Sequence, residues 1–198
     1  MSAPFPNLST PRLILRAPDE RDIPAWFARA TDVVSASLAG DPVPGDISAG
    51  ESWLARSRRR FADGEAIQWA IDEPEASEAI GTITLSLSSD ARAAALGFVL
   101  ARAHWGRGLG SEAAREVLRY AFATLALERV TAEAAARNLA SLRILAKLGF
   151  KPVESFIDPS DGERCERLAL DPGVGYRDIP AFRTSPAATM FPVLRPFG

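Results

Sequence analysis

Residues 104–113, HWGRGLGSEA, place glycine at every second position and then continue into REVLRYAFATL, which has the apolar spacing of a helix. The start of a helix presents backbone N–H groups without partners and the positive end of the helix dipole, so it attracts phosphate. Alternate glycines clear one face of this loop, and Arg107 adds a positive charge beside it. A sharp strand-to-helix turn would also explain the glycines. Three glycines, an arginine and an immediate amphipathic helix favour a pyrophosphate-binding loop.

The residues after the glycines narrow the kind of phosphate ligand. A P-loop ends in Gly-Lys-Ser or Gly-Lys-Thr, and the chain contains neither. Residues 108–113, GLGSEA, do satisfy the dinucleotide pattern G-x-G-x-x-A, and Glu133 lies about 20 residues further on. In dinucleotide-binding folds, however, the strand before this pattern runs directly into the first glycine. Here residues 102–105 intervene and several elements come earlier, so a dinucleotide-binding enzyme is only an alternative.

The pattern along the chain predicts an α/β protein with a mixed sheet, in the order β-α-α-β-β-β-α-β-α-β-β. Residues 95–101, ALGFVLA, form a continuous apolar run that predicts a strand covered on both faces. Asn138 is expected to cap a helix that stops at Gly149. The other strands are expected at 12–17, 67–71, 80–87, 129–135, 150–156 and 164–170, and the other helices after Asp19, over 48–62 and after the glycine loop.

A second stretch, residues 138–150 (NLASLRILAKLGF), directly follows a predicted strand. Together with LGFVL at 96–100 and WGRGLGSEA at 105–113, it resembles the GNAT superfamily of acetyl-CoA-dependent N-acetyltransferases. The RimJ/RimL-like branch, whose members acetylate protein N-termini or small amines, is the most similar. The resemblance covers roughly residues 8–171.

This resemblance implies a GNAT-like mixed, mostly antiparallel twisted sheet flanked by helices. The acetyltransferase domain is expected over residues 1–171. Residues 172–198 form a Pro-rich C-terminal extension that is expected to pack on the domain or on the second copy of a homodimer, because it carries many large apolar side chains.

The resemblance also implies where acetyl-CoA binds. Its pyrophosphate is expected on the backbone amides of the glycine loop, and its pantetheine arm beside the strand that precedes the loop. A backbone N–H near Val99 or Leu100 would then stabilise the developing oxyanion. Asn138 matches a family asparagine that hydrogen-bonds the pantetheine. The expected cofactor-binding residues are Val99, Leu100, Ala101, Arg107, Gly108, Leu109, Gly110, Ser111, Asn138 and Ser141.

Two residues are expected to be catalytic. Ser141 matches a family serine near the sulfur and would donate a proton to the leaving thiolate. Many relatives carry a glutamate where this chain has Ala95, so Glu133 on the neighbouring strand is the best replacement as general base. A solvated strand carboxylate is the competing explanation of Glu133. The missing glutamate also keeps open a second alternative, a non-catalytic acyl-CoA-binding or sensor protein.

The expected reaction is direct attack of a primary amine, from a protein N-terminus or a small molecule, on acetyl-CoA. The acceptor is expected near Trp26, Trp53 and the C-terminal hairpin. The arginines of the predicted helix over 48–62 are expected on its solvated face; they are Arg56, Arg58, Arg59 and Arg60.

Composition excludes several other classes. The net charge of −2 leaves no basic field for nucleic acid. One cysteine, Cys165, and one histidine, His104, do not make a metal site, and Cys165 is expected to be a small buried residue. No apolar run is long enough for a membrane helix, and the first residues do not resemble a secretory signal, so we expect a cytoplasmic protein.

Overall fold

The computed structural model describes residues 4–39, 42–74 and 76–173 of the chain. The predicted C-terminal extension lies almost entirely outside them. The described elements, in chain order, are β1 (Leu8–Ser9), β2 (Ile14–Arg16), the short turn η1 (Glu20–Asp22), α1 (Ile23–Thr31), α2 (Val33–Ala39), α3 (Ala49–Ala62), β3 (Ala66–Asp72), β4 (Gly81–Leu87), β5 (Ala93–Leu100), the short turn η2 (Arg102–His104), α4 (Leu109–Ala123), β6 (Arg129–Ala135), α5 (Leu139–Lys147), β7 (Lys151–Ile157) and β8 (Arg164–Leu170).

The described strands form one sheet in the order β1-β2-β3-β4-β5-β6-β8-β7. Every neighbouring pair is antiparallel except β5 and β6, which are parallel. The predicted fold class, a mixed and mostly antiparallel sheet flanked by helices, is therefore confirmed. The prediction missed β1 and α2. It also placed a strand over residues 12–17, where β2 covers only Ile14–Arg16. A two-residue strand and a seven-residue helix carry too few positions for a periodic signal.

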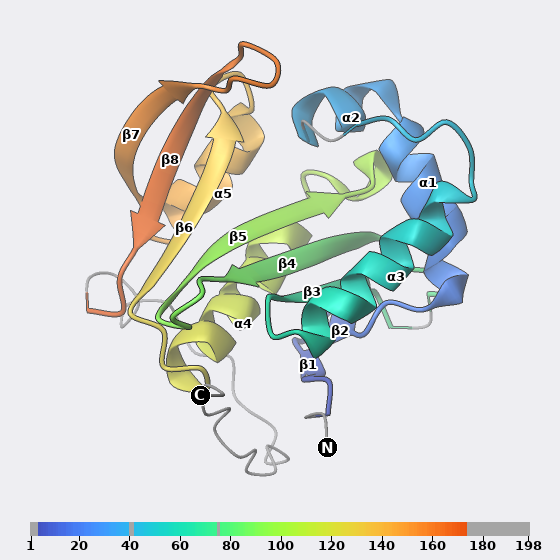
Figure 1. Ribbon diagram of the computed structural model, residues 1–198, viewed down its shortest axis with the longest axis horizontal. Helices are drawn as coiled ribbons and strands as arrows, with labels where there is room; N and C mark the ends of the chain where they lie inside the picture. Colours follow the sequence, from blue (N-terminus) through green and yellow to red (C-terminus); the bar gives the residue numbers. More distant parts are fainter. Residues whose placement is uncertain (1–3, 40–41, 75, 174–198) are drawn as a thin grey trace.

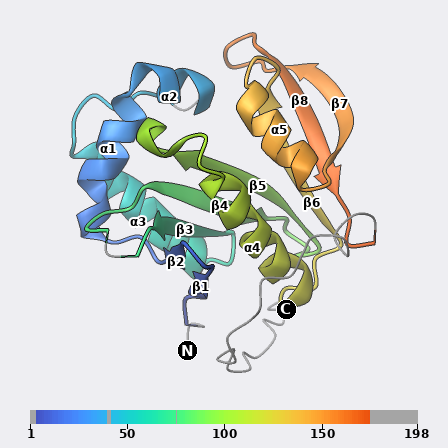
Figure 2. The ribbon, with the colours of Figure 1, turned by 180° about the vertical axis from the view of Figure 1, so that it is seen from behind.

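Helices cover the two faces of the sheet in separate groups (Figures 1 and 2). α4 and α5 lie on one face, while α1 and α3 lie on the other, beside β3 and β4. The apolar stripe of α4 explains its place, because its side chains at helical spacing are fully buried against the sheet. This stripe consists of Ala113, Ala114, Val117, Leu118 and Ala121.

β5 differs from its prediction in a way that matters for function. Leu96 and Leu100 are buried, whereas Gly97 between them is exposed and Val99 is half-buried. The strand is thus covered by α4 on one face only. The continuous apolar run was misleading because small and apolar residues also line the other face, where cavities lie. Cys165 on β8 was expected to be buried but is half-buried.

Candidate active site

The sheet opens between its two parallel strands. β5 and β6 pair only at residues 93–95 and 129–131. Beyond these three pairs the strands diverge (Figure 1), and the rest of β5 keeps β4 as its hydrogen-bonded neighbour. One backbone edge of β5 is therefore left unpaired beside α5.

The register of β5 on β4 shows which amides lie on this open edge. The N–H of Ala101 donates to the carbonyl of Ile80, just before β4, at 2.8 Å, and the register continues without a shift along β5. Hydrogen-bonded and non-hydrogen-bonded pairs alternate in an antiparallel ladder, so Val99 also bonds to β4 whereas Phe98 and Leu100 turn outward. In agreement, the Leu100 carbonyl accepts the indole N–H of Trp105 at 2.8 Å. The N–H groups available for a developing oxyanion are those of Phe98 and Leu100, and not that of Val99.

The glycine loop after β5 has the backbone that the sequence suggested. Gly106 and Gly108 have φ of +75° and +78°, in the left-handed region that favours glycine. α4 begins at Leu109, and its first backbone bond runs from the N–H of Glu112 to the carbonyl of Gly108, at 3.1 Å. The amides of the first turn that precede Glu112 have no partner within the helix, which is the arrangement that binds phosphate.

A buried carboxylate braces this loop against the N-terminal segment. Glu112 is only 5% exposed and accepts hydrogen bonds from Thr10 Oγ1 at 2.6 Å and from Arg12 Nε at 2.7 Å. Arg12 also donates from Nη1 to the carbonyl of Arg107 at 3.0 Å. One arginine therefore joins the first turn of α4 to the glycine loop and holds the loop in shape.

The side chain of Arg107 does not serve the loop as expected. Its guanidinium forms two bonds to Glu73, at 2.6 and 2.9 Å, and also contacts His104 Nδ1 at 3.0 Å. The hydrogen bonds from Arg107 hold the pKa of Glu73 below its usual range. The positive charge that the sequence suggested for phosphate is thus already paired, and Arg107 contributes its backbone to the loop.

A cavity of about 340 Å³, here called the donor cavity, lies between the end of β5, the glycine loop and α5. It brings together eight of the ten expected cofactor-binding residues, while Ala101 and Arg107 lie outside it. The eight are Val99, Leu100, Gly108, Leu109, Gly110, Ser111, Asn138 and Ser141. Ala101 lines a different cavity, between α1, the segment before β4 and η2.

Sequence analysis missed two basic residues of the donor cavity. Arg143 and Lys147 are four residues apart on α5 and both line it. This spacing puts them on one face of the helix, where they supply positive charge to a phosphate ligand. The four-residue spacing of these two basic residues is visible in the sequence. Only the position of α5 beside the glycine loop indicates that they face a phosphate ligand.

Asn138 and Ser141 occupy the start of α5. Asn138 caps the helix as predicted, because its Oδ1 accepts the backbone N–H of Ser141 at 3.1 Å. Its Nδ2 donates to the carbonyl of Leu38 in α2 at 3.4 Å. Ser141 lines the donor cavity and also the neighbouring cavity of about 360 Å³ between β5 and the end of β6.

Glu133 lines this second cavity but not the donor cavity. Its carboxylate accepts a hydrogen bond from Arg167 Nε at 2.7 Å, and its side chain is 50% exposed. Cys165 lines the same cavity, and burial together with nearby carboxylates raises the pKa of its thiol. A thiol with a raised pKa is a poor nucleophile at neutral pH.

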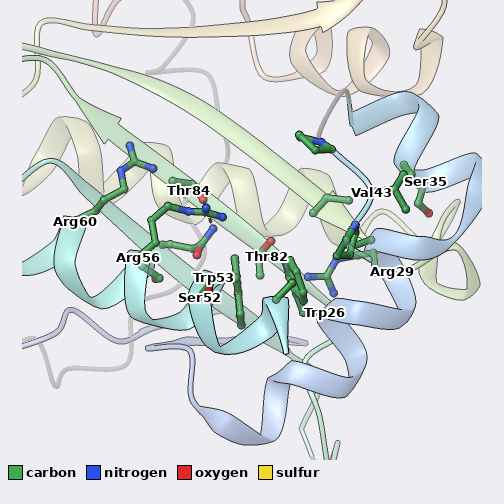
Figure 3. Close-up of a pocket in the computed structure, with 18 of the residues that line it drawn as sticks. Trp26, Arg29, Ser35, Val43, Ser52, Trp53, Arg56, Arg60, Thr82 and Thr84 are labelled. Atoms are coloured by element: carbon green, nitrogen blue, oxygen red, sulfur yellow. Dashed lines mark hydrogen bonds between the residues drawn. The ribbon is translucent and has the colours of Figure 1, made fainter. Parts of the chain in front are cut away.

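A further cavity of about 660 Å³, here called the acceptor cavity, lies between α1, α2, α3 and strands β3 to β5 (Figure 3). Trp26 and Trp53 line it and stack on each other, with ring centroids 5.4 Å apart and planes inclined by 15°. Their helices approach closely at Gly50, where an added Cβ would lie 2.4 Å from Ile23 Cγ2. The expected acceptor residues on α1 and α3 thus form one wall.

Three of these cavities meet at one residue. Val99 lines the donor cavity, the acceptor cavity and the cavity of about 360 Å³. A donor that lies along the open edge of β5 and an acceptor from the helical side would meet there. Over the described part of the chain, no helix is long and apolar enough to cross a membrane, and no group of three or more His, Cys, Asp or Glu is placed to hold a metal ion.

Comparison with known proteins agrees with this architecture. The chain is 32% identical over 148 residues to the uncharacterized N-acetyltransferase YoaA of Bacillus subtilis (strain 168), covering 74% of this chain and 84% of the relative. Among solved structures, RimJ of Mycobacterium smegmatis in complex with CoA-disulfide has a TM-score of 0.71 at 20% identity, covering 86% of this chain and 85% of that chain. The ribosomal L7/L12 α-N-protein acetyltransferase RimL, in complex with coenzyme A, has a TM-score of 0.74 at 17% identity, covering 86% and 99%.

A family match decides the assignment. The family described as "Acetyltransferase (GNAT) domain" matches residues 12–151, which is most of the chain. Its enzymes use acetyl-CoA, and the fit of the glycine-loop amides and the donor cavity to a phosphate-bearing ligand agrees with that donor. The dinucleotide alternative is excluded, because the loop here follows a central strand of a mostly antiparallel sheet. The chain belongs to the GNAT family of acetyltransferases.

Proposed function

We propose that the chain transfers the acetyl group of acetyl-CoA to a primary amine, on a small molecule or a protein N-terminus, by direct attack in a ternary complex. One observation carries this proposal. The donor and acceptor cavities share Val99 on β5 and Ser35 on α2, so substrates in the two cavities would meet beside β5. Residues 1–171 form the acetyltransferase unit in this proposal, and acetyl-CoA as donor fits a cytoplasmic enzyme.

The protein has three roles in this reaction. As the amine nitrogen bonds to the acetyl carbon, the carbonyl oxygen gains negative charge that the outward N–H groups of Phe98 and Leu100 stabilise. As the C–S bond breaks, Ser141 donates a proton to the CoA thiolate. The amine loses its proton to Glu133, directly or through water.

A covalent acetyl-cysteine intermediate is not part of the proposal. Cys165 lines the cavity between β5 and β6 but not the donor cavity, and its thiol has a raised pKa. Direct transfer requires both substrates to be bound together. Initial-rate kinetics should therefore give intersecting, not parallel, lines when both substrates are varied.

The test is a thiol-release assay with acetyl-CoA across a panel of primary amines and peptides, with mass spectrometry of the products. We expect CoA to raise the melting temperature by mass action and NAD to do so less. Release of CoA matched by acetylated amine supports the proposal. Stabilisation by CoA without turnover of any amine would favour the sensor alternative, and equal stabilisation by NAD would contradict the donor assignment.

A further inference from the structure

The acceptor cavity is lined by positive charge. Its charged lining residues within the described part of the chain are Arg29, Arg56 and Arg60, with no aspartate or glutamate among them. Arg56 is exposed, as expected for a solvated helix face, and Arg60 is half-buried, but both also border this cavity at the other end from Arg29 (Figure 3). Arg58 of the same helix does point away, to Glu20 at 2.9 Å. An acetyl acceptor that was only a cation would meet repulsion here.

Two buried donor atoms in the wall of this cavity make no hydrogen bond of good geometry within the described residues. They are Nη1 of Arg29, which is 5% exposed, and Oγ of Ser35, which is 3% exposed. The Ser35 hydroxyl is near enough to the Asp32 carboxylate to help lower its pKa, so Arg29 is the donor without any such neighbour. Burial lowers the pKa of Arg29 to about 10, so the side chain is still charged at neutral pH. The carboxylate of Asp22, which acts on Arg29 through its charge, is bound by Arg16 at 2.7 Å. A buried charge without a counter-ion is unfavourable unless a ligand supplies one.

The cavity between β5 and β6 borders the acceptor cavity, and its lining carries the opposite charge. Gln68, Thr82, Thr84 and Val99 line both the acceptor cavity and the cavity between β5 and β6. Four carboxylates and one arginine are the charged residues that line that second cavity, so its lining is negative on balance. The arginine, Arg137, pairs with Glu163 at 3.0 Å, and Glu133 pairs with Arg167. The other two carboxylates are Asp158 and Asp161. The path across β4 and β5 thus runs from arginines to carboxylates. A molecule with an anionic group at one end and an amine at the other matches this polarity.

We propose that the acceptor cavity binds an anionic group of the acceptor, a carboxylate or a phosphate monoester, with Arg29 and Ser35 as direct hydrogen-bond donors and Arg56 as a second positive charge. The substrate class is therefore amines that also carry an anion. The stacked rings of Trp26 and Trp53 form an apolar wall for the part between the two ends. This inference rests on the proposed function, because it names the class of amine that the enzyme acetylates.

The experiment compares matched amines that differ only in the anion. Phenylalanine against phenylalaninamide tests a carboxylate, and O-phosphoethanolamine against ethanolamine tests a phosphate. Thiol release is measured with saturating acetyl-CoA. We expect at least one anionic member to exceed its neutral partner in kcat/KM by about ten- to a hundredfold, as charge-assisted hydrogen bonds predict. The pair of amines that shows this increase in kcat/KM identifies the recognised anion as a carboxylate or a phosphate.

Variants assign the effect to Arg29. Arg29→Met is expected to raise KM for the anionic amine by about ten- to a hundredfold with a smaller change in kcat, and to raise KM for the matched neutral amine by much less, so that the preference for the anionic amine is lost. Arg29→Lys, which keeps the charge, is expected to recover part of the loss. Arg58→Met is the matched control on α3, where the side chain pairs with Glu20 outside the cavity, and it should behave like the parent.

A binding measurement decides the matter if no amine of the panel is turned over. The protein is first saturated with CoA, and its melting temperature is followed while inorganic phosphate or succinate is added. We expect either anion to raise it in the parent and in Arg58→Met but not in Arg29→Met. Arg29→Met should still be stabilised by CoA, which shows that it folds.

The inference is overturned if neutral and anionic amines are used equally, or if Arg29→Met keeps the preference and the anion-dependent shift. Those outcomes leave the acetyltransferase proposal standing, because thiol release and CoA stabilisation are measured separately. Absence of stabilisation by CoA in the parent would instead contradict the proposed function itself.

Discussion

Gly108 and Gly110 lie two residues apart in the glycine loop, but their replacement by alanine should have different effects. Gly108 has a φ of +78°, and a left-handed backbone is disfavoured for other residues by about 1–2 kcal/mol. For a chain of this size each kcal/mol lowers the melting temperature by about 2–4 °C. Gly110 lies in α4 with an ordinary helical backbone, where alanine gains up to about 1 kcal/mol over glycine. Gly108→Ala should therefore lose stability, and Gly110→Ala should keep it.

Binding of CoA should separate the two positions further. A Cβ on Gly110 would lie 3.4 Å from Ile144 Cδ1 and 3.4 Å from Leu100 Cδ1, so the free protein accommodates it with shifts of a few tenths of an ångström. These side chains line the donor cavity, and the added methyl takes space that the bound CoA needs. One extra methyl in a filled site disfavours packing by about 1–3 kcal/mol, which raises the Kd for CoA about 5- to 150-fold.

Isothermal titration with CoA, together with thermal melts of the free variants, measures both effects. Gly45→Ala is the matched control, because a Cβ there meets nothing within 4 Å and the residue lines none of the three cavities. If Gly110→Ala binds CoA with the parent's Kd, the donor does not pass between β5 and α5. If Gly108→Ala melts like the parent, the argument from its left-handed backbone is wrong.

Three further changes test the catalytic base, a buried ion pair and the helix contact. Glu133→Gln should lower turnover at low amine concentration while leaving the Kd for CoA unchanged, and a pH–rate profile identical to the parent's would remove Glu133 from the mechanism. Arg16→Met should lower the free energy of unfolding by about 3–5 kcal/mol at neutral pH, because it leaves the carboxylate of Asp22 buried and unpaired. Burial alone would raise the pKa of Asp22, but hydrogen bonds from Arg16 lower it below its usual range. The stability that this pair contributes is therefore present above the pKa of Asp22 in the unfolded chain and is lost as the pH falls through its pKa in the folded protein. Urea titrations should accordingly show that the difference in free energy of unfolding between the parent and Arg16→Met becomes smaller in acid. Gly50→Ala should destabilise the protein by about 1–3 kcal/mol in the same assay and raise KM for the acceptor more than Kd for CoA, since its Cβ would lie 2.4 Å from Ile23; an unchanged KM would show that this helix contact does not shape the acceptor cavity.

Features that depend on near neighbours in the chain could be predicted. Glycine at 108 adopts the left-handed backbone before α4, Asn138 caps α5, and Gly149 has a φ of +91° at the end of that helix. Each of these arises within a few residues, where the capping and turn preferences of single residues decide the conformation. The order of the long strands and helices also followed from periodicity. These local patterns, together with the resemblance to the GNAT superfamily that implied a mostly antiparallel sheet and the cofactor-binding residues, predicted the fold class and eight of the residues that line the donor cavity.

Features that depend on distant contacts were decided by the tertiary structure. Arg107 turned from the phosphate loop to Glu73, which lies 34 residues earlier in the chain. The outward N–H groups of Phe98 and Leu100 exist only because β5 and β6 separate after three pairs. Arg29 carries no local signal in its helix, yet the packing of helices around the acceptor cavity buries its side chain and leaves Nη1 without a hydrogen bond among the described residues. Burial and pairing of a charge are set by groups that folding brings together across the chain, and the order of residues along the sequence does not contain them.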